Sequence, residues 1–189
     1  MEQIRRFFQN KYIDFSDQDW SLVASKLARQ EFPKKTLILK KGQVENYVSF
    51  IEEGIVRYYI PKENKELTFE LTFANDFVGA YESFLTRQPS MYHVETVAKT
   101  TLWRMSYKDV QTLYEETQAG NIIGRLANEK MYLEKAKREL SLLNETAEQR
   151  YLNLLKEQPE LIEKIPLQYI ASFIGITPQA LSRIRRRIS

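Results

Sequence analysis

The sequence predicts an α+β fold, in which a jelly-roll-like antiparallel β-domain is followed by helices. Residues 67–73 alternate apolar and polar side chains without interruption, as a half-buried strand does. Other short apolar runs are separated by glycine and proline corners, which is typical of antiparallel barrels and jelly rolls. After Met105 the apolar residues recur every three or four positions, which is the helical period.

The β-domain is preceded by one predicted helix. Ser16 and Asp19 have the spacing of a helix start, and apolar residues follow at helical intervals until Pro33, which cannot continue a helix. Strands are then predicted over residues 47–51, 55–60, 67–73, 94–98 and 101–105. We expect residues 52–54 to form a hairpin corner, because Gly54 can adopt a positive φ.

A second capped helix is predicted from Ser106 to about Glu115, and a long helix follows Gly120. Apolar residues of the long helix step by four and three over three heptads, which predicts a coiled-coil seam. About 25 helical residues reach nearly 40 Å, farther than a small β-domain extends. We therefore expect a homodimer through Ile122, Leu126, Leu133, Ala136, Leu140 and Leu143. The alternative is an amphipathic helix packed on the β-domain.

Thr146 and Gln149 predict a further capping box, with a helix that ends near Gln158. The chain then divides into three predicted parts. Residues 1–117 form the β-domain with flanking helices, residues 118–144 the dimerisation helix, and residues 145–189 a small all-α domain.

The most specific motif is a helix-turn-helix pattern within residues 167–186. The small Ala171 allows the two helices to cross closely, and Gly175 suits a left-handed turn. Thr177 is placed to cap the second helix, with Pro178 in its first turn. The residues expected to hold the two helices together are Ile170, Ile174, Leu181 and Ile184.

The exposed face of the second helix predicts contact with double-stranded DNA. Glutamine can pair with adenine and arginine with guanine, and further arginines can bind phosphate. The predicted surface comprises Gln168, Thr177, Pro178, Gln179, Ser182, Arg183, Arg186 and Arg187. Charge agrees with this, because the last 25 residues contain four arginines and no acidic residue, although the whole chain carries only +3. The alternative is a two-helix packing unit with a basic surface.

Composition disfavours most other functions. The absence of cysteine excludes disulfides, thiolate metal sites and a cysteine nucleophile, and the single His93 disfavours histidine metal cages. The sequence has neither a membrane-length apolar run nor a signal-like start, so we expect a cytoplasmic protein without membrane contact. We predict no enzyme. The competing hypotheses are a sensor or interaction module without DNA binding and a cupin-type metal enzyme.

This order of parts resembles the Crp/Fnr superfamily of bacterial transcription regulators. Residues 75–79, Asn-Asp-Phe-Val-Gly, resemble the G-D-F-x-G segment of its cyclic-nucleotide-binding β-roll, and residues 170–184 resemble its helix-turn-helix. The resemblance implies a homodimer that binds a two-fold operator and contacts RNA polymerase. The family's wing, a hairpin after the recognition helix, is expected to be missing. Pro178 and Gln179 stand where the family often has Arg-Glu, so its operator sequence is not expected.

The resemblance also implies an effector pocket between the β-roll and the long helix. Its candidate residues are Val78, Gly79, Ala80, Tyr81, Glu82, Arg87, Ser90 and Met91. Members that bind cyclic AMP have a glutamate after the glycine matched by Gly79 and an Arg-Ser pair further on. Here Ala80 replaces the glutamate, and Arg87 is out of register. Because a buried phosphate without a cation is costly, we expect no cyclic AMP binding of the usual kind. No cofactor is predicted, and any effector is an unidentified small molecule.

Overall fold

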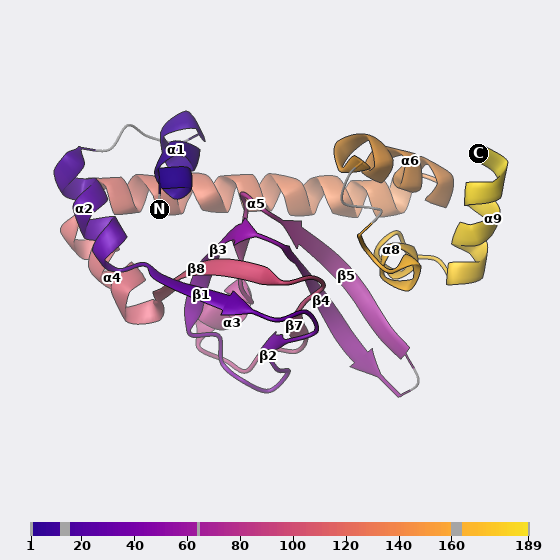
Figure 1. Cartoon of the computed structure of the whole chain (residues 1–189), viewed down its shortest axis with the longest axis horizontal. Coiled ribbons are helices and arrows are strands. Elements are labelled where there is room, and N and C mark those ends of the chain that lie inside the picture. Colours follow the sequence, from indigo (N-terminus) through magenta and orange to yellow (C-terminus); the bar gives the residue numbers. More distant parts are fainter. Residues whose placement is uncertain (1, 12–15, 64, 160–163, 189) are drawn as a thin grey trace.

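The chain folds into a β-roll that lies along one long helix, with shorter helices at both ends of that helix (Figure 1). The structure is a computed structural model that describes residues 2–11, 16–63, 65–159 and 164–188. The predicted α+β class is confirmed. Two four-stranded antiparallel sheets form the roll, in the orders β1-β8-β3-β6 and β2-β7-β4-β5.

Each strand predicted from the sequence is present. The strands are β1 (Ala28–Phe32), β2 (Leu37–Leu39), β3 (Tyr47–Glu53), β4 (Ile55–Lys62), β5 (Lys65–Phe73), β6 (Phe77–Val78), β7 (His93–Thr96) and β8 (Thr100–Ser106). Their inner faces enclose one apolar core, which includes Ile51, Val56, Val94 and Leu102. The strands β1, β2 and β6 were not predicted, because they are too short or too polar to show a clear period of two.

The predicted N-terminal helix is too long. It begins as expected, since Ser16 Oγ accepts a hydrogen bond from the Asp19 N–H at 3.0 Å, but α2 (Asp17–Ser25) ends well before Pro33. The segment before Pro33 forms β1 instead and pairs with β8. Pairing at this sheet edge satisfies the backbone and buries Phe32, and this tertiary gain overrides the helical spacing. A further helix, α1 (Glu2–Lys11), was not predicted.

The corner at residues 52–54 is also different from the prediction. Gly54 has the expected positive φ, at 114°, but β3 and β4 belong to different sheets and are not a hairpin. A Cβ at this position would lie 2.4 Å from Thr100 Oγ1. Gly54 therefore allows the chain to cross from one sheet to the other close to the start of β8.

Further helices follow in the chain. They are α3 (Tyr81–Thr86), α4 (Tyr107–Glu116), α5 (Gln118–Asn144), α6 (Ala147–Glu157), α8 (Leu167–Phe173) and α9 (Pro178–Ile188). The predicted caps at Ser106 and Thr146 are formed, the latter as a complete capping box. No helix in the described ranges is long and apolar enough to cross a membrane.

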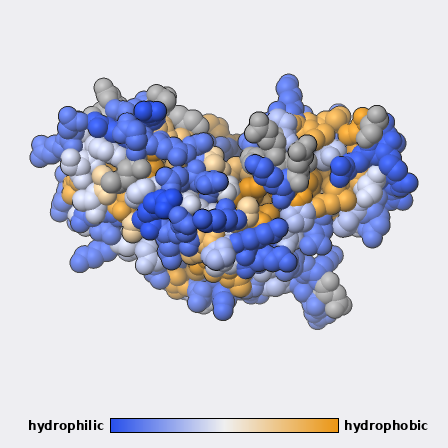
Figure 2. Space-filling view, in the orientation of Figure 1, coloured by the Kyte–Doolittle hydropathy of each residue, from blue (hydrophilic) through white to orange (hydrophobic). Residues whose placement is uncertain are grey.

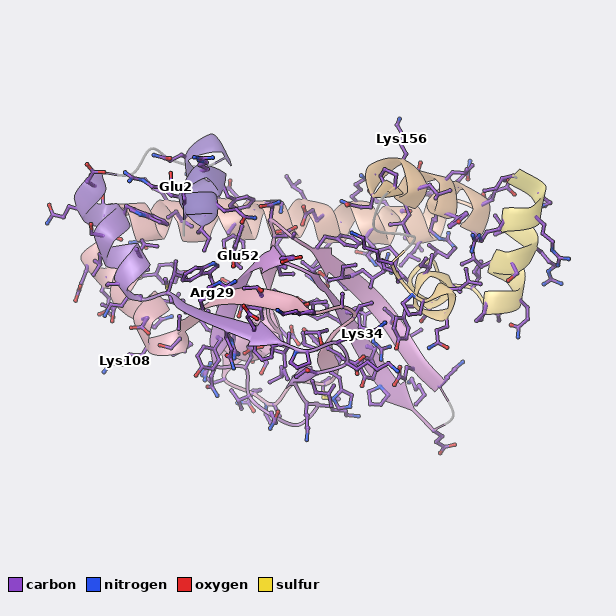
Figure 3. The ribbon with its side chains drawn as sticks, viewed as in Figure 1. Glu2, Arg29, Lys34, Glu52, Lys108 and Lys156 are labelled. Atoms are coloured by element: carbon purple, nitrogen blue, oxygen red, sulfur yellow. The ribbon has the colours of Figure 1, made fainter. Side chains whose placement is uncertain are left out.

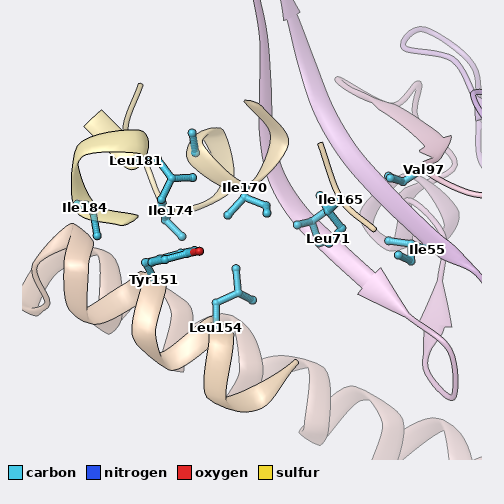
Figure 4. Packing of buried hydrophobic residues seen from close by; sticks show 11 residues of the cluster. Ile55, Leu71, Val97, Tyr151, Leu154, Ile165, Ile170, Ile174, Leu181 and Ile184 are labelled. Carbon is cyan, nitrogen blue, oxygen red and sulfur yellow. The ribbon is translucent and has the colours of Figure 1, made fainter. Parts of the chain in front are cut away.

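Helix α8 docks on the outer face of β5. Figure 4 shows Ile170 of α8 beside Leu71 of β5, with Leu154 of α6 closing the same apolar cluster. Ser172 adds a polar contact, because its hydroxyl accepts a hydrogen bond from the Thr68 N–H at 2.8 Å and donates one to the Thr68 carbonyl at 3.1 Å. The serine thus satisfies both backbone groups of one residue of β5.

Arg57 of β4 lies at the same contact and is 1% exposed. Its guanidinium forms ion pairs with Glu66 at 2.6 Å and Glu95 at 2.8 Å. It also stacks between the rings of Tyr59 and Tyr169, at 4.0 and 3.8 Å from the two centroids. A buried charge is tolerable only when it is paired, and the two glutamates of the roll meet this need, while Tyr169 of α8 covers one face of the guanidinium.

We predict that Ser172→Ala lowers the free energy of unfolding by about 1–3 kcal/mol, because it leaves the N–H and the carbonyl of Thr68 without their partner. Chemical denaturation measures the change. Ser182→Ala is the matched control, since the Ser182 hydroxyl bonds only to the Pro178 carbonyl of its own helix. Equal effects of the two substitutions would contradict the prediction.

Candidate nucleic-acid interface and ligand pocket

Helices α8 and α9 are joined as the sequence pattern predicts. Gly175 has a φ of 82°, and the following Ile176 N–H donates to the Ala171 carbonyl at 2.9 Å. Thr177 Oγ1 accepts from the Ala180 N–H at 3.2 Å and so caps α9. The two helices are held together by buried side chains, namely Ile170, Ala171, Ile174, Leu181 and Ile184.

Seven of the eight residues predicted to contact DNA are exposed. Ser182 is half-buried, and the exposed members are Gln168, Thr177, Pro178, Gln179, Arg183, Arg186 and Arg187. Arg187 forms an ion pair with Glu148 of α6 at 2.5 Å, so its charge is partly neutralised. Arg185, which the sequence pattern did not single out, adds a fourth exposed arginine to α9. Helix α9 therefore presents a positively charged face next to the polar side chains of Gln179 and Ser182.

Helix α5 has two different faces. Ala127, Met131 and Arg138 line a cavity toward the roll. At 100° per residue, the predicted seam residues fall on the opposite side of the helix. Leu133, Leu140 and Leu143 are 65%, 58% and 74% exposed, whereas Ile122, Leu126 and Ala136 are half-buried. Figure 2 shows apolar surface at the end of the molecule where α5 meets α6.

A cavity of about 1180 Å³ lies between the roll, α3, α5 and the C-terminal helices. The predicted pocket residues that line it are Val78, Gly79, Tyr81 and Glu82. The other four predicted residues do not line the cavity. Ala80 and Ser90 are buried, Met91 is 68% exposed, and Arg87 points elsewhere.

Arg87 anchors the loop before β3. It follows α3 and donates to the Glu45 carbonyl at 2.7 Å and to Asn46 Oδ1 at 2.5 Å. Its guanidinium stacks on the ring of Tyr107 at 4.1 Å. The side chain is therefore engaged outside the cavity, so Arg87 does not supply the cation that a cyclic phosphate needs.

The backbone donors at the start of α3 are satisfied from within the protein. Glu45 is 3% exposed, and its carboxylate accepts from the Ala80 N–H at 3.2 Å and the Tyr47 N–H at 3.0 Å. The Gly79 N–H donates to the Tyr58 hydroxyl at 3.0 Å. Burial raises the pKa of Glu45 despite these donors. Sequence reasoning missed Glu45, since a single glutamate in a loop carries no periodic signal.

Three aromatic rings form the wall of the cavity inside the roll. The rings of Tyr58, Phe69 and Tyr92 lie 4.9–6.1 Å apart, centroid to centroid. The Tyr92 hydroxyl donates to Glu82 Oε2 at 2.6 Å, and burial together with this bond raises the pKa of Tyr92. A register shift in the β4–β5 pairing lies beside Phe69. The simple alternation of the sequence did not reveal this shift.

His93 has a structural role. Its Nδ1 accepts a hydrogen bond from the Lys41 N–H at 2.9 Å, and its ring packs against Tyr59. Among the residues that the structure describes, no group of three or more His, Cys, Asp or Glu side chains is arranged to hold a metal ion.

Comparisons with known proteins agree with this architecture. Residues 29–117 match the family model of the cyclic nucleotide-binding domain. The regulator CLP of Xanthomonas campestris, described as responsive to c-di-GMP, has a similar structure (TM-score 0.71, 15% identity), covering 92% of this chain and 91% of that one. A protein described as a crp/fnr-family regulator from Eubacterium rectale gives a TM-score of 0.70 at 16% identity, with coverages of 96% and 85%.

FixK2 of Bradyrhizobium japonicum is similar to the same degree, with a TM-score of 0.70 at 15% identity and coverages of 86% and 84%. A search of curated protein sequences finds no match. At these low identities, the structural similarity shows a shared fold of the β-roll, the long helix and the C-terminal helices.

We predict that Glu45→Gln becomes more stable relative to the wild type as the pH rises. An unfolded glutamate titrates near pH 4.3. Because the folded pKa is higher, the folded wild type binds more protons and loses stability between these two pKa values. The glutamine variant lacks this loss, so the difference in unfolding free energy grows over that interval and is constant above it. Denaturation at several pH values tests this, with the exposed Glu53→Gln as control. A difference that is independent of pH would refute it.

Proposed function

We propose that this chain, which has a cyclic nucleotide-binding domain in residues 29–117 and the fold of the Crp/Fnr regulators, is a homodimeric, sequence-specific DNA-binding transcription regulator. The observation that carries the proposal is the exposed arginine face of α9, on a helix without a single acidic residue. The proposed role is non-catalytic. It places the protein in the cytoplasm, with RNA polymerase as a further partner.

The chemistry of α9 supports direct reading of bases. Gln179 and Arg183 lie one turn apart at the exposed N-terminal part of the helix, which is the part that enters the major groove in helix-turn-helix proteins. Arg186 and Arg187 follow on the next turn, where they are placed for phosphate contacts. Gln168 at the start of α8 and the capping Thr177 supply further polar groups for the backbone.

The exposed leucines of α5 support a homodimer. Three large apolar side chains at heptad spacing, Leu133, Leu140 and Leu143, are left in solvent by the single chain. A second copy of the same helix covers such a stripe by coiled-coil packing. A two-fold dimer also presents two copies of α9, as a two-fold operator requires.

We infer that cyclic AMP is not the effector. The N–H groups of Gly79 and Ala80 are bonded to Tyr58 and Glu45, and Arg87 is held by the loop before β3. A cyclic phosphate would have to displace a buried carboxylate without gaining a cation. The second candidate function is a sensor or interaction module without DNA binding, which the exposed apolar side chains of α5 would also suit.

We predict that Arg183→Ala weakens operator binding by about 1–3 kcal/mol and relaxes the preference at one base pair, as expected for loss of a bidentate arginine contact. Operators are first selected from random duplexes, and affinities are then measured by mobility shift. Lys156→Ala is the matched control, because Lys156 is an exposed cation of α6 that points away from α9 (Figure 3). Equal losses on operator and random DNA would show that Arg183 contacts only phosphate. Absence of any salt-dependent DNA binding would exclude the proposed function.

We predict that Leu133→Glu converts the dimer to monomers, because it buries an unpaired charge in the proposed seam. Light scattering measures the mass of each form. Glu139→Lys also changes the charge at an exposed position of α5, but outside the seam, and should leave the dimer intact. A Leu133→Glu protein that remains dimeric would show that the interface lies elsewhere.

A further inference from the structure

We propose that the cavity between the β-roll and α5 takes a planar ligand carrying an ammonium group, which stacks on the aromatic wall with its nitrogen at Glu82. The proposal rests on the proposed function in one respect, namely that this cavity is the effector site. The proposed ligand is a cation, whereas the cyclic nucleotides for which the matched domain is named are anions.

The aromatic wall favours a flat, apolar ligand body. Phe69 and Tyr92 are only half-buried, and both line the cavity together with the ring of Tyr58. Leu85 of α3 also lines the cavity and is 54% exposed. A planar ring laid on these side chains would remove apolar surface from water and gain stacking contacts.

The charges that line the cavity are unfavourable for an anion. Each lysine or arginine among the described lining residues already has a partner. The pairs are Lys130 with Asp76, Lys135 with Glu70, Lys137 with Glu157, Arg138 with the Phe173 carbonyl, and Arg150 with the Ile174 carbonyl. Seven carboxylates line the cavity against these five cations, so an entering anion would meet net negative charge.

Glu82 is the carboxylate best placed to receive a cation. It projects from α3 next to the aromatic wall, and the contact described for its carboxylate is the neutral hydroxyl of Tyr92 at 2.6 Å. Glu70 of β5, which is paired with Lys135, also lines the cavity. An ammonium group bound there would gain a charge-assisted hydrogen bond and the attraction of the aromatic faces.

The test uses three probes with one ring system and different charges. Tryptamine, indole and indole-3-acetate are titrated into the full-length protein by calorimetry, and cyclic AMP serves as a fourth probe. We expect tryptamine to bind most tightly, indole more weakly, and the two anions not at all. Tighter binding of either anion, or no binding of tryptamine at millimolar concentration, would overturn the proposal.

Substitutions then locate the site. Glu82→Gln keeps an acceptor for the Tyr92 hydroxyl and removes the charge, so it should weaken tryptamine by about tenfold or more and leave indole unchanged. Tyr92→Leu should weaken both compounds, because it removes part of the stacking surface. Glu53→Gln, at an exposed glutamate outside the cavity, is the control. Unchanged tryptamine affinity in Glu82→Gln would refute the assignment.

Ligand binding and DNA binding are read out separately. A protein that shifts operator DNA but does not bind tryptamine would keep the proposed function and lose this inference. A protein that binds tryptamine through Glu82 but no DNA would retain the site and exclude the regulator role.

Discussion

Strand β5 is the element on which the other parts of the molecule depend, because both of its faces are covered by different partners. Phe69 and Glu70 line the cavity, and Leu71 borders the same cavity and also lies in the apolar cluster with α8. The backbone of Thr68 is bonded to Ser172 of α8. The ligand wall and the support of the C-terminal helices are thus parts of one strand. A displacement of β5 by a ligand would reach α8 without any intermediate element.

The buried Arg57 adds directional interactions to the contact between α8 and the sheet. Apolar side chains alone would let α8 slide along the sheet, since the hydrophobic effect has no direction. The guanidinium instead stacks on Tyr169 of α8 while its charge remains paired with two glutamates of the roll. Separating α8 from the sheet would expose one face of the arginine to solvent but leave both ion pairs available. The contact is therefore specific, and it can open without leaving an unpaired buried charge.

Local sequence signals predicted those features that depend on a few neighbouring residues. The caps at Ser16, Ser106 and Thr146, the turn at Gly175 and the strands with a clear period were all found, because each depends on spacing within one element. The failures depend on distant partners. Residues 28–32 form a strand only because β8 offers an edge, and Gly54 joins two sheets because each flanking strand has another neighbour. The Glu45 carboxylate accepts a hydrogen bond from the Ala80 N–H, although the two residues are 35 positions apart in the sequence. No local pattern could indicate this contact.

The hydrogen bonds at the start of α3 and the charges that line the cavity bear on the same question, namely the charge of the ligand. The buried Glu45 supplies a carboxylate acceptor to the Ala80 N–H at the start of α3. Arg87 binds the loop before β3 and does not line the cavity. The contact described for the Glu82 carboxylate is the neutral hydroxyl of Tyr92, so the electrostatics of the cavity favour the proposed cation. The positions of Glu45, Arg87 and Glu82 thus all act in one direction, against an anionic ligand and in favour of the proposed cation.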